Sequence, residues 1–158
     1  MGFLAWLENS GLVAIINESL WAYPMVLTCH AIGMAVVVGI VLMIDIRILG
    51  YARAIPIPSL ERLFSVAWAG FFLNLLSGTL LFSVDATRFF FLNVFRIKIL
   101  LIILGMVSAR MLLRAVRSSA QPLTAEGSAS GKTKLIATLS LIFWIGAIFA
   151  GRLIAYLE

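Results

Sequence analysis

The sequence predicts an all-α integral membrane protein, a four-helix transmembrane bundle preceded by an N-terminal interfacial amphipathic helix. Hydrophobic residues make up 63% of the chain and charged residues only 12%, whereas a soluble domain averages about 45–50% and about 25%. The mean hydropathy is +1.11. A spanning helix needs about 20 mostly apolar residues, and the sequence holds four such stretches. Composition and span length together therefore assign the chain to the membrane class.

Residues 1–19 precede the first long apolar stretch and are expected to form a separate interfacial segment. Short apolar runs lie on either side of the helix breaker at 9–11, and Ser10 is a candidate helix N-cap. The segment is not expected to be a signal peptide, because it lacks a basic N-terminal region and carries Glu8 and Glu18 instead. This pattern favours one or two short amphipathic helices lying on the membrane surface. The remaining residues, 20–158, are expected to form the transmembrane domain.

The transmembrane domain is expected to contain four spans, and few ionisable residues interrupt them. The predicted spans are Leu20–Ile44, Leu63–Val84, Phe89–Leu113 and Leu135–Leu157. Pro56 and Pro58 are expected to end the first helix and its extension. Residues 118–131 are rich in Ser, Ala and Gly and predict a flexible loop.

The distribution of basic residues predicts the orientation in the membrane. The connections at 45–62 and 114–134, with the adjoining helix ends, carry eight Lys or Arg residues, against four on the side of the termini. By the positive-inside rule, we expect both termini in the periplasm of a bacterial inner membrane. Because the basic residues lie beside apolar spans, lipid head groups explain the sequence pI of about 10.0 better than nucleic acid does.

His30 is the only histidine of the chain and lies inside the first span. An ionisable side chain within the membrane is a candidate functional residue by default. At a rise of ~1.5 Å per residue, His30 lies roughly 10 Å below the outer surface and Lys98 roughly 13 Å. Arg152 and Asn74 lie in the same outer half of their spans. Each span thus contributes a polar residue to that half, which predicts a site open to the periplasm.

Haem b is the favoured cofactor for such a site. His30 would be the axial ligand, Lys98 and Arg152 would hold the propionates, and Asn74 would complete the polar lining. A single histidine excludes a bis-histidine haem within one chain, so the second ligand is of another type or two copies share the haem. The function expected is electron transfer by a small subunit rather than a stand-alone enzyme.

Two alternatives remain open from the residues alone. Copper is one, because Met25, Cys29, His30 and Met34 are soft or borderline ligands, with His30 and Met34 one turn apart. The other is a cofactor-free accessory or assembly subunit of a larger membrane complex or homo-oligomer. Small residues such as Gly33, Gly39 and Gly146 suit close helix contacts. In that case His30 would hydrogen-bond a neighbour such as Asn74.

Asp45 and Arg47 lie near the cytoplasmic end of the first span and are expected to have structural roles. Residues two positions apart on a helix point in directions roughly 200° apart, so Asp45 and Arg47 do not face each other. Each is expected to pair with a neighbouring helix, with Arg110 or Arg114 available to Asp45.

Three segments resemble a family of small bacterial four-helix membrane proteins of unknown function, distantly similar to the CopD-type membrane domain. They are HAIGMAVVVGIVLMIDIRILG at 30–50, FLNVFRIKILLI at 91–102 and FWIGAIFAGRLIAYL at 143–157. The resemblance implies a four-helix bundle and singles out His30, Asp45, Arg47, Lys98, Gly151 and Arg152. Relatives often carry a further histidine where this chain has SARMLLRAV at 108–116. Its absence here argues against any metal or haem role that needs two histidines.

Overall fold

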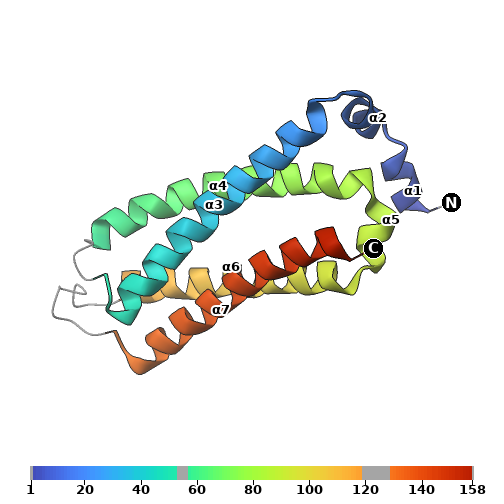
Figure 1. The fold of residues 1–158 in the computed structure, drawn as a ribbon. Helices are drawn as coiled ribbons and strands as arrows, with labels where there is room; N and C mark the ends of the chain where they lie inside the picture. Colours follow the sequence, from blue (N-terminus) through green and yellow to red (C-terminus); the bar gives the residue numbers. More distant parts are fainter. Residues whose placement is uncertain (1, 53–56, 119–128, 158) are drawn as a thin grey trace. The chain divides into compact units, whose positions relative to one another are not determined.

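The computed structural model describes residues 2–52, 57–118 and 129–157, which form helices joined by short turns, without a strand. The long helices are α3 (Ala22–Leu49), α4 (Ile57–Val84), α6 (Asn93–Ser118) and α7 (Gly131–Leu153) (Figure 1). The short ones are α1 (Phe3–Glu8), α2 (Gly11–Glu18), α5 (Ala86–Phe91) and the 3₁₀ turn η1 (Ile154–Tyr156). The all-α prediction is confirmed.

Three helices within the described residues are long and apolar enough to cross a membrane, namely Ala22–Leu49, Arg62–Val84 and Gly131–Tyr156. They correspond to the predicted first, second and fourth spans. The predicted third span is not among them, since Arg96, Lys98 and Arg110 interrupt α6. The coarse class is therefore a helical protein with three candidate membrane-crossing helices.

The predicted third span is also wrong in its boundaries. It was expected to run without a break over 89–113, but Leu92 has an extended backbone (φ −75°, ψ 114°) and separates α5 from α6. Lys98 therefore lies only five residues from the first residue of α6, or roughly 8 Å along its axis. This is shallower than the sequence-based depth, because that depth was counted from a helix start several residues earlier.

The end of α3 is set by Gly50 rather than by the prolines. The Gly50 amide donates to the Arg47 carbonyl at 3.1 Å, and the Tyr51 amide donates to the Ile46 carbonyl at 3.2 Å. These two bonds form a Schellman motif, which requires a left-handed residue, and Gly50 has φ 100°. Pro58 is instead the second residue of α4. Pro56 and most of the predicted 118–131 loop lie outside the described residues.

The chain divides into two compact units. The first contains residues 1–37 and 66–93, and the second contains residues 38–65 and 94–158. Helices α3 and α4 contribute to both units.

In the first unit, the N-terminal half of α3 packs antiparallel to the C-terminal half of α4 at a very close distance. A Cβ on Gly33 would lie 2.9 Å from the Asn74 backbone nitrogen, and one on Gly70 would lie 2.8 Å from Val36 Cγ1. A Cβ on Gly78 would lie 3.0 Å from His30 Cε1. Residue numbers on one helix rise as those on the other fall, which defines the antiparallel register. Glycines let two membrane helices approach this closely.

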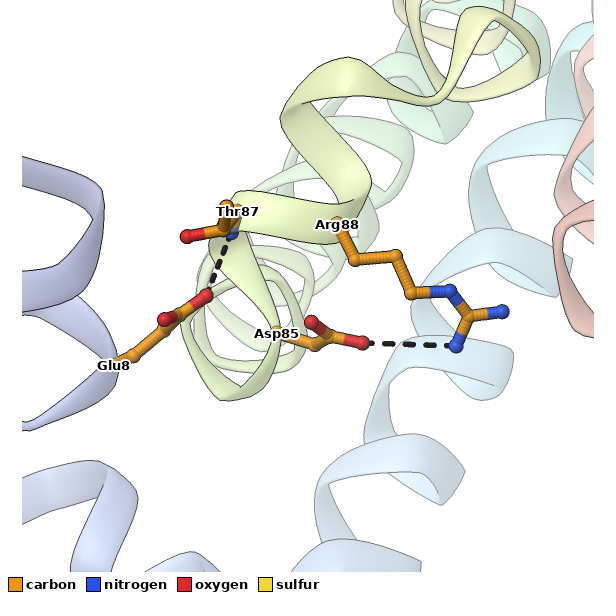
Figure 2. A network of polar contacts seen from close by, with 4 residues as sticks. All are labelled: Glu8, Asp85, Thr87 and Arg88. Carbon is orange, nitrogen blue, oxygen red and sulfur yellow. Dashed lines mark hydrogen bonds and ion pairs between the residues drawn. The ribbon is translucent and has the colours of Figure 1, made fainter. Parts of the chain in front are cut away.

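The N-terminal helices also belong to the first unit, and α1 caps α5. The Asp85 side chain precedes α5 but makes no capping bond. Instead, Glu8 Oε1 of α1 accepts a hydrogen bond from the Thr87 amide at 2.6 Å (Figure 2). The Asp85 carboxylate forms an ion pair with Arg88, with 3.6 Å between Oδ2 and Nη1. A helix N-terminus has amides without intrahelical partners, so the Glu8 carboxylate takes over the cap. Ser10 occupies the N-cap position of α2, as predicted, but its side chain makes no capping bond.

In the second unit, α6 and α7 lie side by side and antiparallel (Figure 1). Cβ atoms on Gly105 and Gly146 would lie 2.9 Å from Trp144 Nε1 and 3.2 Å from Leu101 Cδ1. Ser130 starts α7, its Oγ accepting from the Thr133 amide at 3.2 Å. The most buried side chains of this unit include Ile44, Leu112, Asp45 and Ser140.

Candidate functional site

His30 points from α3 toward α4, and the two helices exchange hydrogen bonds around it. His30 Nδ1 lies 3.1 Å from the backbone carbonyl oxygen of Asn74 and 3.2 Å from Ser77 Oγ. In the opposite direction, Asn74 Nδ2 donates to the His30 carbonyl oxygen at 2.8 Å. The histidine and the asparagine thus form a reciprocal pair between two membrane helices.

The hydrogen-bonding partners define the protonation of Nδ1. A carbonyl oxygen can only accept, so Nδ1 must donate to Asn74. Ser77 gives its own hydroxyl proton to the Leu73 carbonyl at 2.6 Å, so its oxygen also acts as an acceptor toward His30. Both contacts therefore require Nδ1–H. In the neutral imidazole this places the basic lone pair on Nε2.

Gly78 lies one turn beyond Asn74 and faces the same imidazole. A Cβ there would lie 3.0 Å from His30 Cε1 and 3.3 Å from Nδ1. The Nδ1–Cε1 edge of the ring therefore rests on the α4 backbone, and any side chain at position 78 would displace it. This contact between Gly78 and His30 depends on how α3 and α4 are aligned.

The structure divides the four residues predicted to bind haem into two pairs. His30 and Asn74 contact each other in the first unit, whereas Lys98 and Arg152 belong to the second. The Lys98 side chain crosses α7 at Gly151, where a Cβ would lie 3.5 Å from both Cε and Nζ. Arg152 is exposed in the last turn of α7.

The position of Lys98 has an electrostatic explanation that needs no bound anion. Gly151 lies in the last turn of α7, which ends at Leu153. The C-terminal end of a helix carries partial negative charge and stabilises nearby cations by about 0.3–1 kcal/mol. The α7 dipole thus partly compensates the positive charge of Lys98.

The predicted copper ligands differ in their exposure. Met25 is 61% exposed, whereas Cys29, His30 and Met34 are half-buried. Within the described part of the chain, no three His, Cys, Asp or Glu side chains lie close enough to hold a metal ion.

Asp45 and Arg47 are both buried, at 0% and 7% exposure. The expected pairing of Asp45 with Arg110 or Arg114 is absent: neither carboxylate oxygen has a hydrogen-bond partner, and both arginines are exposed. Ser140 of α7 is the polar neighbour of the carboxyl, although no hydrogen bond of ordinary geometry joins them. Sequence reasoning missed Ser140, because a single serine in an apolar helix gives no signal.

Comparison of the chain with protein-family models, curated proteins and solved structures gave no match. The resemblance to the CopD-type membrane domain therefore stays a prediction. The fold and the described contacts define the class, a helical protein with three helices able to cross a membrane and a histidine held between two of them.

Proposed function

We propose that this protein is a small electron-transfer subunit of the bacterial inner membrane that binds haem b through His30. The observation that carries the proposal is the donation of Nδ1–H to the Asn74 carbonyl. Histidines that bind metals almost always donate their other ring N–H in this way, which fixes the tautomer and increases the basicity of the ligating nitrogen. Nε2 of His30 would then ligate the iron.

The residues present fit such a role in part. Asn74 and Ser77 orient the ring, and Gly78 supports its Nδ1–Cε1 edge. Haem, when bound, supplies one-electron transfer chemistry. Because the chain has one histidine, a bis-histidine site would need His30 of a second copy, which agrees with the predicted homo-oligomer. Lys98 and Arg152 remain predicted propionate partners only.

The proposal includes α6 as a fourth membrane-crossing helix, which completes a four-helix bundle. Its apolar residues between Ile99 and Ala109 support this, and the flanking basic residues would reach the head groups. With four crossings, both termini lie on the same side of the membrane, and the basic residues favour the periplasm for that side.

The haem proposal predicts a visible absorption band that depends on His30. Protein purified from membranes of haem-replete cells should show a Soret band, and His30→Ala should abolish it. Cys29→Ser, at the neighbouring half-buried position of α3, should retain it. Bis-histidine ligation by two copies should give about half a haem per chain. A colourless, copper-free preparation would refute both the haem and the copper readings.

A cofactor-free accessory subunit is the second candidate, and the reciprocal His30–Asn74 bonds favour it. These bonds join α3 to α4 and partly satisfy a polar pair that would otherwise be costly in the membrane. In this case the preparation is colourless, yet the chain should still co-purify with partner subunits or as a homo-oligomer in mild detergent.

The orientation is testable with single cysteines in a Cys29→Ser background. Gly2→Cys and Lys132→Cys both occupy exposed positions at opposite ends of the predicted spans. An impermeant maleimide added to spheroplasts should label Gly2→Cys at once and Lys132→Cys only after the membrane is permeabilised. The reverse pattern would contradict the periplasmic assignment of the termini.

A further inference from the structure

Asp45 lies on the buried face of α3 and is surrounded by apolar side chains of its own helix. Val41, Ile44 and Ile48 are 4%, 2% and 5% exposed, and Asp45 itself is 0% exposed. Val41 and Ile48 lie four and three residues from Asp45 and therefore share its face of the helix. An ionised carboxylate in such surroundings costs several kcal/mol unless a partner compensates it.

Within the described residues, no cation compensates this carboxylate. On α3, Arg47 lies two positions from Asp45, about 200° around the helix, and makes no hydrogen bond to the Asp45 carboxylate. Of the basic side chains described on α4 and α6, Arg62, Arg96, Arg110 and Arg114 are exposed, and the half-buried Lys98 lies against Gly151 of α7. Helix α7 has no charged residue between Lys134 and Arg152. Both Asp45 oxygens lack a hydrogen bond, so the negative charge has no protein counterpart there.

A second buried polar group without a hydrogen bond lies beside Asp45. Ser140 of α7 is 0% exposed, its Oγ has no partner, and it is the polar neighbour of the carboxyl. By contrast, Ser108 of α6 is 6% exposed and donates to the Leu104 carbonyl at 2.8 Å. Most serines in these helices bond back to their own helix in this way, and Ser140 does not.

We propose that Asp45 and Ser140 form an intramembrane binding site for one small hard cation, a proton or Na⁺. The two carboxylate oxygens and the hydroxyl oxygen are hard donors, which suit such cations and not soft metals. A bound cation neutralises the buried charge, and the Ser140 oxygen shares its coordination or accepts its hydrogen bond. Intramembrane carboxyls in these surroundings mark ion or proton pathways. The site is independent of His30.

The test compares cation-dependent stability in wild-type protein and in Asp45→Asn, which keeps the side-chain shape without the charge. Thermal unfolding in detergent is measured from acidic to alkaline pH, in NaCl and in choline chloride at equal ionic strength. A ligand that binds only the folded state raises its stability. Wild type should therefore be stabilised by Na⁺ or by falling pH relative to Asp45→Asn. Specific stabilisation by Na⁺ assigns the cation as Na⁺, and dependence on pH alone assigns it as a proton.

Two serine variants make the test specific to the site. Ser140→Ala should weaken the apparent cation affinity about tenfold, the effect of losing one hydrogen bond or ligand to a charged group. Ser108→Ala, also buried but already bonded to its own helix, should leave it unchanged. Infrared spectra provide a readout that does not depend on unfolding, because a protonated Asp45 contributes a carboxylic acid carbonyl band that Asp45→Asn lacks. The proposal is overturned if wild type and Asp45→Asn respond identically to both cations and no such band exists.

Discussion

Replacing Gly33 with leucine should destabilise the protein by about 3 kcal/mol or more, because overfilling a packed interface costs about 1–3 kcal/mol even for smaller changes. A Cβ at position 33 would lie 2.9 Å from two backbone atoms of α4, the Asn74 nitrogen and the Gly70 oxygen. Backbone atoms cannot rotate away, so α3 and α4 must separate. Their separation would also lengthen the His30–Asn74 bonds.

Gly39→Leu on the same helix is the matched control, because a Cβ there meets nothing within 4 Å. Both variants should be compared by reversible unfolding in mixed detergent micelles. Gly39→Leu is expected to change the free energy of unfolding by less than about 0.5 kcal/mol, as surface substitutions usually do. Equal losses in the two variants would contradict the close α3–α4 approach.

Trp144→Ala should be the most damaging single change in the second unit, with an expected loss of about 3–5 kcal/mol. Trp144 is 4% exposed, and its indole packs against Gly105 of α6, where a Cβ would lie 2.9 Å from Nε1. Removing the ring leaves a cavity between α6 and α7 and removes many dispersion contacts.

Phe149→Ala provides the comparison on the same helix, since Phe149 is 67% exposed. In a bilayer or micelle, its ring contacts lipid or detergent, which refills the space after truncation. Unfolding of the two variants in the same micelles should separate them by at least about 2 kcal/mol. A similar loss at position 149 would show that aromatic size, rather than packing against α6, determines the cost.

The sequence predicted the long helices well because length and apolar composition dominate their formation. It misplaced two boundaries for local reasons. The end of α3 depends on the left-handed Gly50, whereas the nearby prolines were expected to end this helix. The break at Leu92 has neither a proline nor a glycine beside it, so the run looks continuous although it forms two helices.

The candidate site was less predictable than the fold. His30 stood out because it is alone in an apolar helix, and Asn74 because it is a strong polar group in another. The contacts of His30 with Ser77 and Gly78 depend on how α3 and α4 are aligned. Ser140 beside Asp45 likewise depends on the packing of α7. One sequence contains no record of such pairings between helices.

Nitrogen NMR tests directly whether α4 holds the His30 imidazole through an Nδ1–H donor. Because the chain has one histidine, ¹⁵N-histidine labelling gives one ring to observe without assignment. In protein free of bound metal at a pH where the imidazole is neutral, we expect a protonated Nδ1 and an unprotonated Nε2. Ser77→Ala removes the side-chain acceptor of Nδ1 and should shift this tautomer equilibrium. A neutral ring protonated at Nε2, unchanged by Ser77→Ala, would contradict this arrangement.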